Sequence, residues 1–309
     1  MAHDRASAWR KLEDPRWDEI RRALDWMSAP GMHAYVSGFF PEAEGWVDHA
    51  RRRVLEPLRA VLAAERRGGI RLLSLGCGNG SVDAACMERG WPVDEYHVAE
   101  YDDQLLAAAA ERLRAQGRAG RVVPQRLDFE ALAGLDLGRF DAIFFCHSLH
   151  HCADIEGLLD FLRRSLSPHG VVFGADYFGG ARLQPDVDVL PLLRSLYAAL
   201  PDRVKVNLAT GEFEPEYRLP DLRAVMAHDP SEAPRSGDLR SLFLAQFHEL
   251  ETIPMGGTLL RPLLAMRAGN FLDADETTGS LLRLLCAFER ELIRSGGIRS
   301  DDLFFHGRL

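Results

Sequence analysis

The chain has 309 residues, of which 47% are hydrophobic and 27% charged, so it has the composition of an ordinary globular protein with ample apolar material for a core. Its formal net charge of −9 argues against a nucleic-acid-binding surface and against binding to an anionic membrane. The polar N-terminus has no apolar signal core, and the longest apolar runs are too short to span a bilayer. The five cysteines lack the spacing of a disulfide scaffold, so we expect a cytoplasmic protein with reduced thiols.

Residues 5–68 have a helical pattern, because apolar residues recur at steps of three and four. A loop with glycine and proline separates the two helical runs and contains Tyr35, a ring that we expect to pack in the core or to close over a ligand. From residue 70 the pattern changes to short apolar runs that alternate with helical segments, which predicts a parallel sheet with helices on both faces. The expected strands are 70–75, 96–99, 121–125, 140–146 and 170–175, and the expected helices are 81–88, 103–115 and 155–166.

The alternation of strands and helices stops after residue 180. The polar segment 229–236 is interpreted as a helix-capping turn, with Asp229 as the cap, Pro230 as the first helical residue and Glu232 completing the capping box. In the functional alternative, Glu232 and Arg235 face a substrate. The remaining elements are expected as helices at 190–200, 259–268 and 280–295 and strands at 247–253 and 302–308. The predicted fold class is α/β, a Rossmann-like, doubly wound and mostly parallel seven-stranded sheet with a helical N-terminal extension and a helical lid insertion.

A glycine-rich turn, Gly76 to Gly80, follows the first predicted strand. Glycine lets the backbone turn sharply there and lets a ligand approach the main chain closely. Glu100 ends the next strand twenty positions after Gly80, where a carboxylate can accept hydrogen bonds from both ribose hydroxyls. A dinucleotide fingerprint needs glycine at its sixth position, where this chain has Ser81. The turn therefore suits a sulfonium nucleoside with a zwitterionic amino-acid tail better than a pyrophosphate.

Two further candidate regions follow the third and fourth predicted strands. Asp128 and Phe129 are a carboxylate and an aromatic ring suited to the adenine of a nucleoside, although an acid at a strand end is, taken alone, more often a helix cap. The fourth strand ends at Cys146 and runs into the histidine-rich segment 147–151, at the edge where ligands of open α/β sheets bind. Because its histidines and Cys152 are packed into six positions without a second ligand group, we predict no metal there.

Residues 70–180 resemble a class I S-adenosylmethionine-dependent methyltransferase. The resemblance rests on the glycine motif, the acid ending the second strand, the acid after the third strand, the Phe-Asp strand with its His-His pair, and the 166–170 turn. Motifs at 177–184, 229–236 and 256–257 resemble a bacterial subgroup with a helical insertion after strand five. His169 departs from the family, which usually has glycine in this turn, and predicts a slightly strained left-handed residue.

The resemblance implies S-adenosylmethionine as the cofactor. It also implies four segments, namely a helical extension or lid at 1–68, the cofactor-binding core at 69–180, a substrate lid at 181–240 and the C-terminal part of the core at 241–309. The cofactor contacts that it implies are Gly76, Cys77, Gly78, Gly80, Glu100, Tyr101, Asp128, Phe129, Cys146 and His147.

Methyl transfer is an in-line displacement at a carbon that positive sulfur already activates, so positioning and exclusion of water account for much of the catalysis. A hydroxyl nucleophile gains from a general base. The candidate bases are His150, His151, Asp176 and Glu232, with a structural helix cap as the equal alternative for His151. The candidate substrate contacts are Tyr35, Tyr177, Arg182 and Arg235, the arginines being suited to an anionic group.

These patterns predict a methyltransferase that acts on a small molecule, with an oxygen nucleophile as the favoured acceptor, and that exists as a monomer or homodimer. A nicotinamide-dependent oxidoreductase and a non-catalytic S-adenosylmethionine-binding protein are the alternatives. A nucleic-acid or protein methyltransferase is disfavoured, because the chain has no basic strip interleaved with aromatics and no Asn-Pro-Pro-Tyr-type signature after the fourth strand.

Overall fold

The computed structural model describes residues 25–272 and 275–309, and these form two compact units. Of the described residues, the first unit comprises those up to Phe39, those of Gly179–Glu232 and those of Pro254–Asp302. The second comprises Phe40–Phe178, Ala233–Ile253 and Leu303–Leu309. The part of the expected helical region 5–68 that precedes residue 25 lies outside the described residues. The lid roles expected for 1–68 and 181–240 stay predictions.

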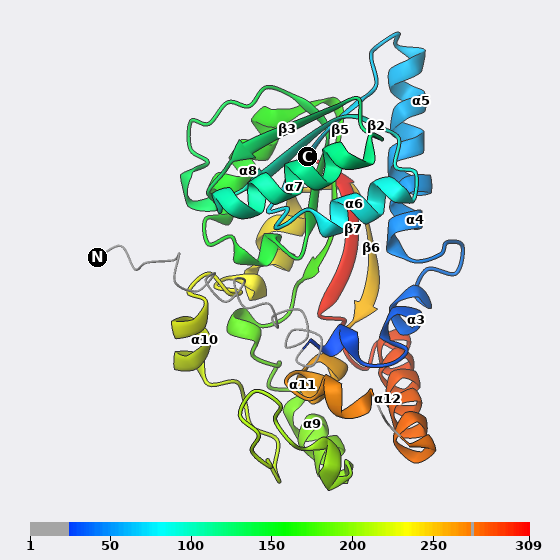
Figure 1. Ribbon diagram of the computed structural model, residues 1–309, viewed down its shortest axis with the longest axis vertical. Coiled ribbons are helices and arrows are strands. Elements are labelled where there is room, and N and C mark those ends of the chain that lie inside the picture. The colour runs from blue at the N-terminus through cyan, green and yellow to red at the C-terminus, as the bar shows by residue number, and fades with distance from the viewer. Residues whose placement is uncertain (1–24, 273–274) are drawn as a thin grey trace. The chain divides into compact units, whose positions relative to one another are not determined.

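A seven-stranded sheet is the framework of the second unit (Figure 1). Its order is β3-β2-β1-β4-β5-β7-β6, so the chain reverses direction across the sheet between β1 and β4. The pairs β1–β2, β2–β3, β1–β4 and β4–β5 are parallel, which confirms the predicted mostly parallel, doubly wound fold. The strands are β1 (Ile70–Leu75), β2 (Val93–Glu100), β3 (Arg121–Arg126), β4 (Phe140–Cys146), β5 (Leu166–Tyr177), β6 (His248–Gly256) and β7 (Asp302–Arg308).

The helices of the second unit pack on both faces of this sheet. α6 and α7 lie together across one face (Figure 1), and the right-handed crossover from β4 to β5 places α8 on the other. Asp102 and Asp154 cap α7 and α8 by accepting backbone N–H bonds, which satisfies donors that a helix start leaves unpaired. The helices are α4 (Trp46–Ala50), α5 (Glu56–Ala64), α6 (Ser81–Glu88), α7 (Asp103–Gln116) and α8 (Ile155–Ser165), with a π-helical turn at Arg51–Leu55 joining α4 to α5.

Strand β4 divides the core between the two faces of the sheet. Successive side chains of a strand point to opposite faces. Phe145 belongs to the apolar cluster that includes Leu158 and Leu162 of α8. The ring of Phe144 lies instead 5.0 Å from that of Trp91 and 5.1 Å from that of Phe173. Because both faces of β4 are buried, its sequence is an almost continuous apolar run, which is why its position was predictable.

The first unit is helical and is organised around the buried carboxylate of Glu289. This carboxylate accepts the Tyr35 hydroxyl and the backbone N–H groups of Gly257, Leu259 and Leu260. Burial raises the pKa of both Glu289 and Tyr35. Among the described residues, no helix has the length and apolarity needed to cross a membrane. The helices are α3 (Met32–Ser37), α9 (Leu190–Ala199), α10 (Leu222–His228), α11 (Leu260–Leu264) and α12 (Glu276–Arg294).

Three local predictions are wrong. The expected loop around Tyr35 contains helix α3. The turn expected at Pro168 and Gly170 is part of β5, which begins directly after α8, and the irregular β4–β5 register between Phe140 and Ala142 accommodates it. Since His169 lies in this extended segment, it has no positive φ; its ring pairs with Glu65 at 2.6 Å.

The capping box expected at residues 229–232 is also wrong, because no helix begins at Pro230. Asp229 instead closes a local turn, in which Oδ1 accepts the Ser231 backbone N–H at 2.8 Å and the Ser231 hydroxyl at 2.6 Å. Short polar side chains commonly bond the backbone two residues onward in this way, and such a turn competes with helix initiation.

We expect Glu289→Ala to lower the free energy of unfolding by about 3 kcal/mol, because it removes the acceptor of several buried N–H and O–H donors. Urea denaturation with an unchanged m value measures the effect. Glu291→Ala on the same helix is the control; Glu291 is exposed and pairs with Arg294, so its loss should cost under about 0.5 kcal/mol. Equal effects of the two substitutions would contradict the anchoring role of Glu289.

Candidate functional site

The glycine-rich turn after β1 has the backbone geometry that only glycine adopts readily. Gly76, Gly78 and Gly80 have φ values of +69°, +54° and +71°. A Cβ on Gly76 would lie 2.5 Å from the Cβ of Ser148, and one on Gly80 would lie 2.8 Å from the Cα of Ala109 in α7. The turn is therefore held between the loop after β4 and helix α7, whereas the space beside Gly78 is open.

Glu100 at the end of β2 ties this turn to the next loop. Its Oε2 accepts the Gly78 backbone N–H at 2.9 Å, and its Oε1 accepts those of Tyr101 at 2.7 Å and Asp102 at 3.3 Å. A carboxylate has about four lone-pair positions, so Glu100 keeps acceptor capacity for a ligand. Tyr101 is 37% exposed, and its ring lies beneath the guanidinium of Arg126.

Asp128 and Phe129 stand at the corresponding end of β3. Asp128 caps the short helix Phe129–Ala131 by accepting the Glu130 backbone N–H at 3.0 Å, so the capping interpretation is confirmed. Phe129 stacks on Phe145 with ring centroids 6.5 Å apart. The loops after β1, β2 and β3 thus lie at the carboxyl ends of neighbouring parallel strands, where open α/β sheets bind ligands.

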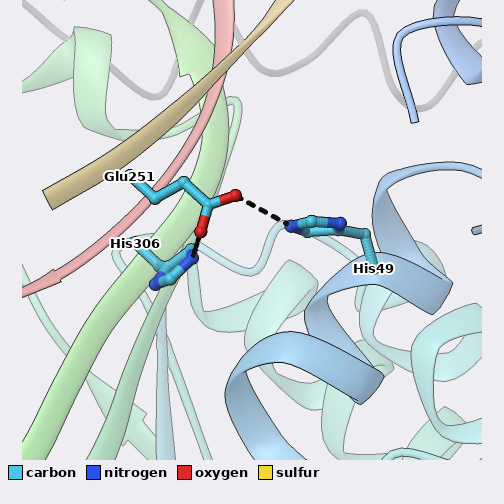
Figure 2. A group of neighbouring side chains, drawn as sticks. All are labelled: His49, Glu251 and His306. Atoms are coloured by element: carbon cyan, nitrogen blue, oxygen red, sulfur yellow. Dashed lines mark hydrogen bonds and ion pairs between the residues drawn. The ribbon is translucent and has the colours of Figure 1, made fainter. Parts of the chain in front are cut away.

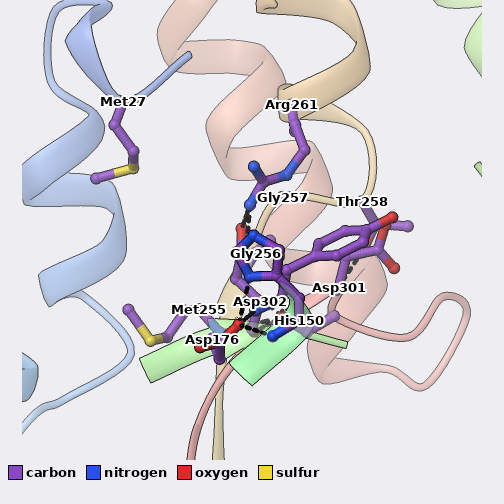
Figure 3. Close-up of polar contacts among 12 residues, drawn as sticks. Met27, His150, Asp176, Met255, Gly256, Gly257, Thr258, Arg261, Asp301 and Asp302 are labelled. Carbon is purple, nitrogen blue, oxygen red and sulfur yellow. Dashed lines mark hydrogen bonds and ion pairs between the residues drawn. The ribbon is translucent and has the colours of Figure 1, made fainter. Parts of the chain in front are cut away.

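Asp176, near the end of β5, organises the loop after β4. Its buried carboxylate accepts the backbone N–H groups of Ser148 and Leu149 at 2.8 Å each. The same carboxylate lies 2.6 Å from Nδ1 of His150 (Figure 3). Burial alone would raise the pKa of Asp176, but the adjacent His150 and the N–H donors hold that pKa well below its usual range. When His150 is neutral, an ionised Asp176 favours the tautomer that carries the proton on Nδ1.

The other residues predicted in this loop lie beside that pair. The His151 ring is tilted against that of His150, with ring centroids 4.3 Å apart. The ring centroid of buried Tyr177 lies 6.2 Å from that of His150. His147 has a left-handed backbone, φ +50°, and donates its N–H to the Ala175 carbonyl at 2.9 Å. Burial raises the pKa of the Cys146 thiol. All the cysteines have free thiols.

Two polar residues near the glycine turn have structural roles that the sequence did not predict. The Ser148 hydroxyl donates to the Leu75 carbonyl at 2.6 Å, which joins the ends of β1 and β4. Asp83 is buried in α6 and accepts the Tyr96 hydroxyl at 2.9 Å, and burial raises its pKa. An acid within the otherwise apolar stretch 82–87 was the available signal for Asp83, whereas the serine contact has no local sequence signature.

Arg235 forms ion pairs with two acidic side chains of its own unit. Its guanidinium binds both Glu156 carboxylate oxygens, at 2.7 and 3.0 Å, and Asp238 at 3.0 Å. Bonding to Arg235 lowers the pKa of Glu156 to about 2. An anion-binding role for Arg235 would therefore require a substrate to displace these carboxylates.

Tyr35, Arg182 and Glu232 belong to the first unit. Tyr35 is buried and donates its hydroxyl to Glu289. Arg182 donates to the backbone carbonyls of Pro230 at 2.7 Å and Glu232 at 2.9 Å, so it braces the polar segment 229–236. The substrate contacts predicted for Tyr35 and Arg182 and the catalytic role predicted for Glu232 stay predictions.

Residues 73–172 match the family described as "Methyltransferase domain". This match and the strand order confirm the predicted class, a class I S-adenosylmethionine-dependent methyltransferase fold. The chain is 25% identical over 150 residues to a protein of Psychrobacter cryohalolentis named ubiquinone biosynthesis O-methyltransferase, covering 48% of this chain and 57% of that one. It therefore spans just over half the length of this relative.

Two other relatives broaden the comparison. A Talaromyces variabilis protein named S-adenosyl-L-methionine-dependent Diels-Alderase iccD is 28% identical over 124 residues, covering 40% of this chain and 41% of that one. The solved structure of the plantazolicin methyltransferase BpumL, in complex with a triazolic desmethylPZN analog and SAH, aligns with 12% identity and a TM-score of 0.42, covering 99% of this chain and 96% of that one.

We expect Gly80→Ala to destabilise the protein by about 1–3 kcal/mol more than Gly78→Ala. Both substitutions place alanine at a positive φ, but only the new Cβ at position 80 meets the α7 backbone, at 2.8 Å. Chemical denaturation of the two variants isolates the cost of that close approach. Equal stabilities would show that α7 moves away freely and would contradict the tight packing of Gly80 against Ala109.

Proposed function

We propose that the protein transfers the methyl group of S-adenosylmethionine to an oxygen nucleophile of a small molecule. The arrangement that carries the proposal is the Gly76–Gly80 turn bonded to the Glu100 carboxylate at the point where the strand order reverses. When bound, the cofactor would supply a methyl group already activated by positive sulfur. The relatives named O-methyltransferases support the choice of oxygen.

The residues proposed to hold the cofactor come from three loops. The open space beside Gly78 suits the amino-acid tail, and the Glu100 carboxylate has lone pairs available for the ribose hydroxyls. Asp128 and Phe129 are proposed to face the adenine. Cys77 and Tyr101 in these loops, and Cys146 and His147 at the end of β4, complete the predicted contacts.

His150 is proposed as the general base, with Asp176 as the residue that positions it. The 2.6 Å contact with the ionised Asp176 fixes the imidazole orientation and makes Nε2 the basic atom. Asp176 itself is suited to positioning, because burial encloses it and backbone N–H groups occupy both of its oxygens. His151 and Glu232 remain further candidates for the base, and Tyr35, Tyr177, Arg182 and Arg235 remain candidates for substrate contact.

Glu100→Ala is expected to weaken S-adenosylmethionine binding about 10- to 100-fold, because a carboxylate contributes charge-assisted hydrogen bonds of about 1.5–3 kcal/mol each. Isothermal titration calorimetry measures this change. Asp103→Ala is the matched control, an exposed acid just after the same strand, and should leave the affinity within about twofold. An unchanged affinity in the Glu100 variant would remove the basis of the cofactor site.

The acceptor is best found by mass spectrometry, comparing extracts incubated with isotopically labelled S-adenosylmethionine in the presence and absence of the protein. A labelled product with a methyl ether would support the proposal. Binding of the cofactor without any labelled product would reject methyl transfer and favour a non-catalytic or differently reacting S-adenosylmethionine-binding protein.

With the acceptor in hand, His150→Gln should lower the rate of methyl transfer about 10²- to 10⁴-fold, the usual contribution of a general base. Cofactor affinity should stay within about twofold, since the substitution is conservative in size. His151→Gln tests the neighbouring ring and should have the smaller effect. If the His150 variant keeps the full rate, His150 is not the general base.

A further inference from the structure

The second unit contains a cluster of metal-ligating side chains outside the cofactor loops. Figure 2 shows that His49 of α4, Glu251 of β6 and His306 of β7 point toward one another. Nε2 of His306 lies 3.0 Å from Oε2 of Glu251, and Nε2 of His49 lies 3.9 Å from Oε1. One ligand atom from each residue lies within 4.8 Å of the other two. We propose that these residues form a binding site for a divalent transition-metal ion of the Zn²⁺ class.

The separations fit such an ion. Zinc bonds nitrogen and carboxylate oxygen at about 2.0–2.2 Å, so tetrahedral ligands lie roughly 3.3–3.6 Å apart. The distances of 3.0 and 3.9 Å lie on either side of this range, and small side-chain rotations bring them into it. Two imidazoles with one carboxylate form a common ligand set for Zn²⁺ and neighbouring transition metals, and the remaining positions are open to water.

His49 gives the second, independent indication of a ligand. It is only 8% exposed, and its Nε2 has no hydrogen-bond partner among the described residues. Buried polar atoms are nearly always satisfied, so this nitrogen lacks a partner that a metal ion would supply. Phe40 and Phe304 flank the imidazole at ring-centroid distances of 5.4 and 5.2 Å, and its Nε2 faces Glu251.

The charges around the cluster are compatible with this role. Two carboxylates, Glu42 and Glu251, and the guanidinium of Arg53 lie near enough to His49 to interact with it electrostatically, and Glu251 also interacts with His306. The Glu251 side chain is 42% exposed, which gives a hydrated ion access from solvent.

The site joins elements that are distant in sequence. His49 lies about 200 residues before Glu251, and β6 and β7 are adjacent at one edge of the sheet. The ion would link α4 to that edge and would take the place of the direct His306–Glu251 hydrogen bond. The proposed cofactor contacts lie at the ends of β1–β4, on strands other than the β6 and β7 that carry Glu251 and His306.

The test is calorimetric titration of the full chain with ZnCl₂ after treatment with a chelator and its removal. We expect saturable binding of one equivalent at this cluster, visible d–d absorption with Co²⁺, and no comparable binding of Mg²⁺, which prefers oxygen ligands. Glu251→Gln and His306→Asn should each weaken Zn²⁺ binding at least tenfold. His248→Gln, which removes an exposed histidine from the same strand, should bind as the wild type does.

Glu251→Gln keeps the size of a half-exposed side chain, so it tests the site even if His306→Asn fails to fold. Absence of one-equivalent binding, or wild-type affinity in Glu251→Gln, would overturn the proposal. If His150→Asn loses Zn²⁺ binding and Glu251→Gln does not, the ion binds at the His150–His151 pair, and this result would also overturn the proposal. Cofactor affinity measured on the same samples separates this outcome from failure of the proposed methyltransferase function.

Discussion

The loops at the centre of the sheet depend on one buried carboxylate. Asp176 accepts backbone N–H groups from the loop after β4 and from its own strand end, and it holds the His150 ring at 2.6 Å. A buried, ionised carboxylate is stable only because each of its lone pairs accepts a hydrogen bond. The path of the chain after β4 is therefore fixed by electrostatics as well as by packing. Ser148, held by this carboxylate, in turn bonds Leu75 and leaves space only for glycine at position 76.

This dependence explains which parts of the molecule were predictable. The central strands β1 and β4 were predicted at their observed bounds, because strands buried on both faces have continuous apolar runs. The glycine turn and Glu100 were predictable because their spacing reflects local strand-turn-helix geometry. The start of β5 was missed, since Pro168 and Gly170 usually interrupt strands and the irregular register that tolerates them depends on the neighbouring strand.

Sequence patterns did not predict the polar contacts between residues that are distant in the chain. Glu289 lies on a helix with ordinary amphipathic spacing, and nothing local indicates that it binds the Tyr35 hydroxyl 254 positions away. Substrate contact was one of the roles predicted for Arg235, and its observed partner Glu156, 79 positions earlier in the chain, was not predicted. A charged residue in a polar segment has many possible partners, and only the fold selects among them. The cluster of His49, Glu251 and His306 was not predicted for the same reason, since only the fold brings these distant residues together.

The protonation states near the proposed cofactor loops fit a reactive sulfonium. A thiolate beside an activated methyl group would itself be alkylated, because the thiolate is the nucleophilic form of cysteine. Cys77 and Cys146 lie at the ends of β1 and β4, where this hazard would be greatest. Burial raises the pKa of both thiols, and the charges of Glu100 near Cys77 and Asp176 near Cys146 act in the same direction. The charges of the acids proposed to bind the ribose and to position His150 thereby add to the effect of burial and disfavour the thiolate form of both cysteines.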